Sequence, residues 1–194
     1  MRIRLNPDDG ASYSEDGQRI LGIDPGTVTT GWGVVEAVGG RLCHLAHGTI
    51  GALAGSGQGR RLSRIYRGLQ EIVHRYGPQG VSLEKVFFAR NAQSALKLGQ
   101  ARGVALLAAA ENELAIYEYS SAEIKVAVVG YGRASKEQVQ KMVASLLHLT
   151  GRVPADAADA LAAAICYLHQ RHFHARVVGA LPVAGREVRR ARMP

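Results

Sequence analysis

The sequence predicts an α/β fold, in which helices flank a mixed sheet of five strands. Three observations predict it: alternating apolar residues early in the chain, apolar runs separated by helical spacing in the middle, and a series of helical patterns towards the end. The chain has 194 residues, of which 47% are hydrophobic and 21% charged. This length supplies one hydrophobic core and is too short for two full-sized domains.

The first three strands are predicted to form a meander. An apolar run, RILGID, covers residues 19–24, and two alternating segments, TGWGVVEAV and RLCHLAHGTI, cover residues 30–38 and 41–50. Gly39-Gly40 between the alternating segments indicates a hairpin turn. These three strands therefore form the antiparallel part of the predicted sheet.

The rest of the sheet is predicted to be parallel. Apolar residues recur at helical spacing over 59–76, and a buried strand is predicted at 80–88. The helix at 59–76 is predicted to form a right-handed crossover connection between the meander and this strand. The strand at 80–88 should then lie parallel to the strand at 19–24. The elements that follow are a helix at 92–112, a strand at 114–120, helices after the capping boxes Ser120–Glu123 and Ser135–Gln138, and an alanine-rich helix from Pro154.

The charge distribution divides the chain into three parts. Residues 1–18 carry two basic and four acidic groups and are predicted to be a flexible extension, and residues 19–172 form the folded domain. Residues 173–194 are predicted to be a disordered basic tail. The net charge of +8 favours a polyanionic partner such as nucleic acid, because neutralising phosphates releases counterions.

The sequence also excludes several classes of protein. It has no apolar run of about 18 residues and no apolar stretch typical of a signal peptide, which predicts a cytoplasmic protein without a membrane partner. Cys43 and Cys166 lack the spacing of a zinc site, so both are interpreted as small hydrophobic residues. We therefore expect a globular domain without structural zinc or disulfides.

Four acidic residues occupy unusual places in the predicted fold. Asp24 and Glu84 each follow an apolar strand segment, and parallel neighbouring strands about 4.8 Å apart would bring them together. Asp156 and Asp159 share one face near a helix start, where they are either helix caps or ligands. Four carboxylates at one edge of a sheet need a cation, and this set of oxygen donors suits Mg²⁺ or Mn²⁺.

Three segments carry a resemblance to a known family. LGIDPGTVTTGWGVV, SLEKVFFARNAQSALKLGQARGVAL and PADAADALAAAICYLH together resemble the RuvC family of Holliday-junction resolvases, over about residues 19–172. The resemblance implies a ribonuclease H-like fold of the retroviral integrase superfamily. It also implies a structure-specific endodeoxyribonuclease of homologous recombination and DNA repair, which resolves four-way junctions. The family cuts opposed strands by paired, symmetric, metal-dependent nicks that leave ligatable 5′-phosphate and 3′-hydroxyl ends.

The same resemblance assigns roles to individual residues. It implies that four carboxylates are catalytic and bind two Mg²⁺ ions, with Mn²⁺ as a substitute, and we expect Asp24 to bridge the two ions. It also implies that Lys136 acts in catalysis and that an aromatic and several basic residues bind DNA. The catalytic acids are Asp24, Glu84, Asp156 and Asp159, and the DNA-binding residues are Phe87, Arg90, Lys125 and Lys136.

Three further basic residues have roles that the sequence leaves open. Lys85 stands where glutamine is more usual in the family, with an effect on either metal preference or phosphate contact. Lys97 and Arg102 are further candidates for DNA contact, because they lie close to the matched motifs.

The partners follow from the symmetry of the substrate. A four-way junction is nearly two-fold symmetric, so paired nicks are most simply made by a homodimer with one site in each subunit. The small-residue helix at 92–111 is a candidate dimer surface, and it is equally well interpreted as a core helix. The resemblance further implies the branch-migration proteins RuvA and RuvB as partners.

Two other functions compete with the nuclease. An ATP-dependent phosphotransferase or ATPase could use the DPGT segment as a phosphate loop, but it needs a second lobe for which 194 residues leave no space. A catalytically inactive protein could bind junctions without cutting them, although all four carboxylates are present. Metal-dependent cutting distinguishes the nuclease from the inactive binder.

Overall fold

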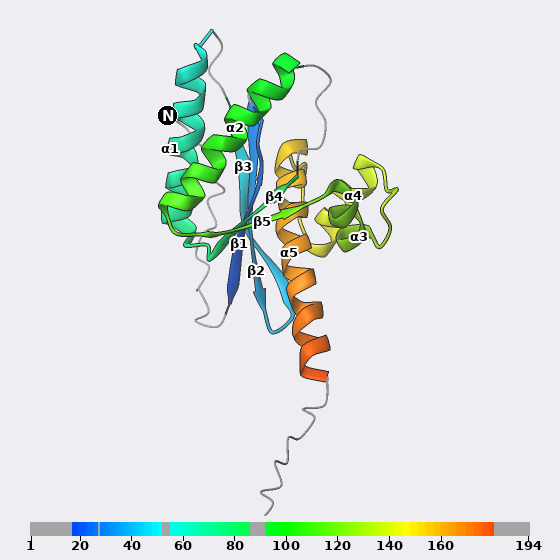
Figure 1. The fold of residues 1–194 in the computed structure, drawn as a ribbon. Coiled ribbons are helices and arrows are strands. Elements are labelled where there is room, and N and C mark those ends of the chain that lie inside the picture. The colour runs from blue at the N-terminus through cyan, green and yellow to red at the C-terminus, as the bar shows by residue number, and fades with distance from the viewer. Residues whose placement is uncertain (1–16, 27, 52–54, 86–91, 181–194) are drawn as a thin grey trace, which may run out of the picture.

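The computed structural model describes residues 17–26, 28–51, 55–85 and 92–180 (Figure 1). The described part contains one five-stranded sheet in the order β3-β2-β1-β4-β5. β1 pairs antiparallel with β2, β2 pairs antiparallel with β3, and β4 lies parallel to both β1 and β5. The predicted mixed sheet is therefore confirmed. The strands are β1 Gln18–Asp24, β2 Thr29–Val38, β3 Arg41–Gly51, β4 Gly80–Glu84 and β5 Ala115–Tyr119.

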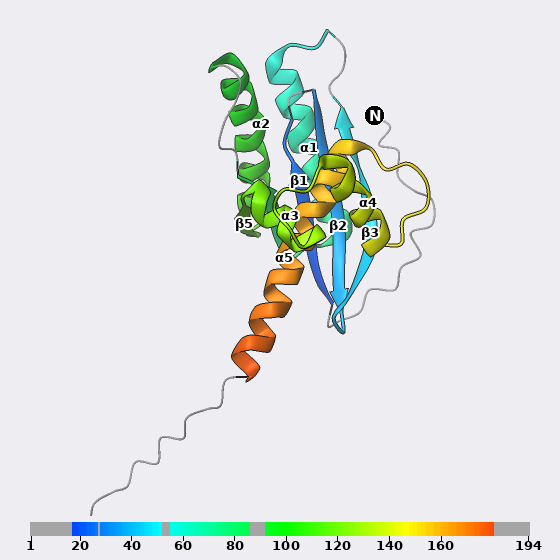
Figure 2. The ribbon, with the colours of Figure 1, turned by 90° about the vertical axis from the view of Figure 1, so that its right-hand side faces the viewer.

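Helices cover both faces of this sheet (Figures 1 and 2). One hydrophobic cluster joins the sheet to α1 (Gln58–Tyr76) and α2 (Ala92–Glu111). A second cluster, on the face seen in Figure 2, joins it to the remaining helices. These are α3 (Ser121–Val129), α4 (Lys136–Leu146) and α5 (Ala155–Ala180). The result is a three-layer arrangement with the sheet in the middle.

The helix boundaries follow local chemistry. Both predicted capping boxes are present: Ser120 and Glu123 begin α3, and Ser135 and Gln138 begin α4, each pair satisfying backbone N–H groups at the helix start. α3 ends at Val129, and Gly130, which follows it, adopts the left-handed conformation with φ of 91°. Because α3 and α4 are fixed at their first turns, Lys125 and Lys136 have defined positions beside α5.

Two predicted boundaries differ from the structure. β4 ends at Glu84, not at residue 88, and residues 86–88 lie outside the described part of the chain. α5 continues to Ala180, so residues 173–180 of the expected disordered tail are helical. No glycine or proline interrupts residues 171–178, and the helix can therefore propagate past the predicted end of the domain. Within the described residues, no helix is long and apolar enough to cross a membrane.

Candidate active site

Asp24 and Glu84 mark the carboxyl ends of two neighbouring parallel strands. The register pairs Ile23 of β1 with Leu83 of β4, and the two acids are the next residues along each strand. Both acids are partly exposed, whereas Ile23 and Leu83 are buried in the core. The predicted juxtaposition of these two strand ends is thus present in the structure.

The start of α5 brings the other two acids to the same edge of the sheet. α5 packs against β1 and β2 where these strands carry glycines instead of larger side chains. A Cβ at Gly31 would lie 1.9 Å from the carbonyl oxygen of Asp156, and one at Gly22 would lie 1.8 Å from that of Ala160. This backbone-to-backbone approach, possible only at glycine, sets the position of Asp156 and of Asp159 one turn later.

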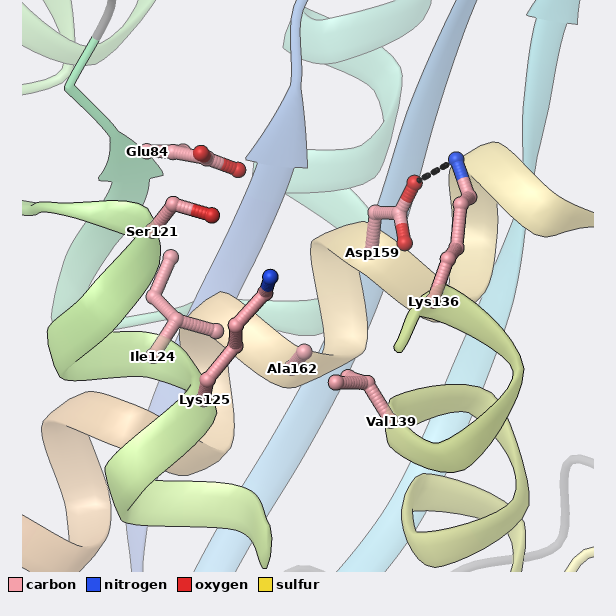
Figure 3. Close-up of a pocket in the computed structure, with 8 residues that line it drawn as sticks. All are labelled: Glu84, Ser121, Ile124, Lys125, Lys136, Val139, Asp159 and Ala162. Carbon is pink, nitrogen blue, oxygen red and sulfur yellow. Dashed lines mark ion pairs between the residues drawn. The ribbon is translucent and has the colours of Figure 1, made fainter. Parts of the chain in front are cut away.

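A cavity of about 260 Å³ opens beside these acids (Figure 3). Glu84 comes from the end of β4, Lys125 from α3, Lys136 from α4 and Asp159 from α5. The Lys136 Nζ atom lies 2.5 Å from Oδ2 of Asp159, and the lysine side chain is 55% exposed. The cavity thus combines two carboxylates with two ammonium groups. The carboxylates suit a bound cation, and the ammonium groups suit an anionic ligand beside it. Its other lining residues are Ser121, Ile124, Val139 and Ala162.

The electrostatics of Asp24 show that the other three acids act on this carboxyl group. The pKa of Asp24 is raised from 3.8 to about 7, first by burial and then by repulsion from the carboxylates of Asp159, Asp156 and Glu84, whereas the Lys136 ammonium opposes the rise. A carboxylate so strongly destabilised is one that gains from a bound cation.

The donor chemistry of this edge fits a divalent metal ion. Its four carboxylates are the hard oxygen ligands that Mg²⁺ and Mn²⁺ prefer. Across the described residues, no three acidic, histidine or cysteine side chains are already gathered as a metal site. Asp159 is instead paired with Lys136. The backbone positions of the four acids are set by β1, β4 and α5.

The raised pKa of Asp24 predicts a pH-dependent stability. Because its pKa is higher in the folded than in the unfolded protein, the stabilising contribution is complete below pH 3.8 and is lost as pH rises through about 7. In chelator, the free energy of unfolding of the wild type should fall relative to that of Asp24→Asn by up to about 4 kcal/mol between pH 4 and pH 8.

Urea denaturation of both proteins across this pH range measures the difference. Adding Mg²⁺ at pH 8 should reduce it, because a bound cation stabilises the ionised carboxylate. A difference that does not change with pH would contradict the raised pKa of Asp24 in the folded protein.

The remaining predicted residues have mixed outcomes. Phe87 and Arg90 lie outside the described residues. Lys125 lines the cavity, and Lys97 is exposed on α2. Arg102, a candidate for DNA contact, instead turns inward and binds the backbone oxygen of Glu84 and the carboxylate of Glu118.

Sequence reasoning missed Ser121 as a lining residue of the cavity. Its only signal was its place directly after the helix cap Ser120. Ser121 faces the cavity because it lies in the first turn of α3, and this placement leaves no recognisable motif in the sequence.

Comparison with known proteins identifies the family. The model of the family described as crossover junction endodeoxyribonuclease RuvC matches residues 20–167. The chain belongs to the RuvC family. The matched range contains Asp24, Glu84 and both aspartates of α5. Family membership leaves no support for the ATP-dependent phosphotransferase or ATPase.

Curated RuvC proteins are similar over most of the chain. Crossover junction endodeoxyribonuclease RuvC of Syntrophotalea carbinolica is 51% identical over 156 residues, which are 80% of this chain and 97% of that protein. The RuvC of Cupriavidus metallidurans is 47% identical over 178 residues, which cover 90% of this chain and 98% of that protein. The RuvC similarity is therefore not confined to short motifs.

Solved structures support the same assignment. Thermus thermophilus RuvC in complex with a Holliday junction substrate superposes with a TM-score of 0.76 at 33% identity, covering 81% of this chain and 96% of that one. The yeast mitochondrial Holliday junction resolvase Ydc2 has a TM-score of 0.60 at 13% identity, which shows the fold alone. The ribonuclease H-like fold implied by the sequence is confirmed.

Proposed function

We propose that this RuvC-family chain is a metal-dependent endodeoxyribonuclease that resolves four-way DNA junctions in homologous recombination and repair. The observation that carries the proposal is the electrostatic coupling of Asp24 to Asp156, Asp159 and Glu84, two of which line a cavity together with Lys125 and Lys136. Such an arrangement suits a phosphodiester, because the carboxylates would hold metal cations and the lysines would contact the phosphate at the same place. The similarity to RuvC of T. thermophilus, solved with a Holliday junction, supports this substrate.

The four acids are proposed to hold two Mg²⁺ ions, for which Mn²⁺ can substitute. When bound, such a pair of ions activates a water molecule and stabilises the charge on the phosphoryl group and on the leaving 3′-oxygen. Asp24 lies on the central strand β1 and is coupled to the acids on both sides, which supports it as the shared ligand. Glu84 would complete the ligands of one ion, and Asp159 with Asp156 those of the other.

The lysines are proposed to contact the DNA backbone near the scissile phosphate. Lys136 neutralises Asp159 in the structure, and its ammonium group would be available to the phosphate if Asp159 held a metal ion instead. Lys125 lines the same cavity from α3. Phe87 is proposed to stack on an unpaired base, which contributes about 1–3 kcal/mol, and Arg90 to bind nearby phosphate.

The outer side of α2 supports the proposed homodimer. α2 buries Ala101 and Ala105 against the core, so it is a core helix on one side. Its other side exposes Leu96 (65%) and Leu107 (51%) with Gly103 between them, where an added Cβ would meet open space. A second copy could approach this side closely and bury both leucines. A dimer would place one site in each subunit for nicks in opposed strands, and RuvA and RuvB are proposed as further partners.

Cleavage of a synthetic mobile four-way junction tests the proposed function. The junction and a linear duplex of the same sequence are incubated with Mg²⁺, with Mn²⁺ or with chelator. We expect paired nicks, sealable by a ligase, in the junction only and with metal only. Junction binding without cutting under either metal would favour the inactive binder, and equal cutting of the duplex would contradict structure specificity.

A further inference from the structure

Arg102 links α2 to the strand end that carries Glu84. Its Nη1 donates a hydrogen bond of 2.8 Å to the backbone oxygen of Glu84, and its Nη2 pairs with the carboxylate of Glu118 on β5. The Arg102 side chain is only 16% exposed, so its two nitrogens are committed within the protein. Three elements, α2, β4 and β5, therefore meet through this guanidinium.

The peptide unit after Glu84 is held at both of its polar groups. Its carbonyl belongs to Glu84 and accepts from Arg102, and its N–H belongs to Lys85 and donates to the backbone oxygen of Tyr119 over 2.7 Å. The paired register of β4 with β1 ends one residue earlier, at Leu83. Arg102 thus binds the carbonyl of the first β4 residue beyond the paired register with β1. Holding this peptide plane restricts rotation of Glu84 about its Cα–C bond, and so the direction of its side chain.

The guanidinium group is suited to this double contact. It is a planar fork whose nitrogens donate to two acceptors at once, whereas the ammonium of lysine is a point charge on a flexible stem. Glu118, whose side chain is 37% exposed, fixes the orientation of the fork. The carbonyl of Glu84 therefore has a donor of defined direction.

We propose that Arg102 is a positioning residue for Glu84, fixing the backbone from which the Glu84 carboxylate enters the cavity. This inference rests on the proposed role of Glu84 as a metal ligand. Arg102 acts through Glu84 and not on the reacting atoms. Its removal should weaken metal binding without weakening the binding of junction DNA.

Metal binding measured without turnover tests this inference. Mn²⁺ is titrated into the DNA-free protein and followed by the EPR signal of unbound Mn²⁺, for wild type, Arg102→Gln, Arg102→Lys and Glu84→Gln. Loss of a group that orients a metal ligand typically costs about 10–100-fold in affinity or activity, and we expect a loss of this size for Arg102→Gln. Arg102→Lys should lie between it and the wild type, because lysine retains one of the two contacts.

Controls separate positioning from general destabilisation. Arg41→Gln, which removes an exposed arginine at the start of β3, should leave Mn²⁺ affinity unchanged. Junction affinity in chelator should stay within about twofold of the wild type for Arg102→Gln. Glu118→Gln keeps the contact with the Glu84 carbonyl but loses the ion pair, and it should weaken Mn²⁺ binding less than Arg102→Gln does.

Two results would overturn the proposal. One is wild-type Mn²⁺ affinity in folded Arg102→Gln, and the other is a loss of junction binding in parallel with the loss of Mn²⁺ binding. If Arg102→Gln does not fold, wild-type Mn²⁺ affinity in Glu118→Gln would overturn it. A wild-type protein that binds Mn²⁺ through Glu84 but does not cut junctions would refute the proposed function and leave the role of Arg102 to be decided by the Mn²⁺ titration.

Discussion

Asp24→Asn is expected to abolish junction cleavage while junction binding is retained. Asparagine has the same shape, but it removes the charge of the carboxylate that is coupled to Asp159, Asp156 and Glu84. A ligand shared by two metal ions contributes several kcal/mol to stabilising the transition state, and each 1.4 kcal/mol is a factor of ten in rate. We therefore expect a decrease on the order of 10³-fold in the single-turnover cleavage rate with Mg²⁺.

Gel-shift titration in chelator measures the binding side of this prediction. Affinity should be equal to or higher than that of the wild type, since one negative charge near the phosphates is removed. Glu71→Gln, which neutralises an exposed acid on α1, is the matched control and should cut at the wild-type rate. Cleavage by Asp24→Asn within tenfold of the wild-type rate would show that Asp24 is not an essential ligand.

The sequence was sufficient to predict the strands that carry Asp24 and Glu84. Period-two and apolar patterns define β1, β2 and β3, and a crossover connection through α1 predicts that β4 runs parallel to β1. If β1 and β4 are also neighbours, as the structure shows, the two acids meet at one edge of the sheet. Asp156 and Asp159 were harder to interpret, because aspartate at a helix start is also an ordinary cap.

Other features depend on contacts between distant parts of the chain. Nothing in the sequence around Arg102 distinguishes an inward guanidinium from one that faces DNA, because its partners Glu84 and Glu118 lie 18 and 16 residues away. Likewise, Gly22 and Gly31 look like glycines of an ordinary strand until α5 is placed against them. Tertiary packing, not local pattern, gives these residues their roles.

Gly31→Ala is expected to lower both stability and cleavage. Its Cβ would lie 1.9 Å from the carbonyl oxygen of Asp156 and 2.2 Å from the carbonyl carbon, and both belong to the helix backbone. Neither can rotate away, so the start of α5 must move from β2. Overpacking of this kind costs about 1–3 kcal/mol in the free energy of unfolding. Because Asp156 moves with the helix, cleavage should fall by about 10²-fold, as expected for a shift of about 1 Å in an active site.

Gly51→Ala provides the matched control for this substitution. Gly51 ends β3 and pairs with Thr29 at the start of β2, but an added Cβ there would meet no atom within 4 Å. Its stability and cleavage rate should therefore remain near those of the wild type. Urea denaturation and single-turnover cleavage at saturating Mg²⁺ separate the two effects of Gly31→Ala, since only folded protein contributes to the rate. A destabilised Gly31→Ala that cuts at the wild-type rate would show that cleavage does not depend on the exact position of Asp156 against β2.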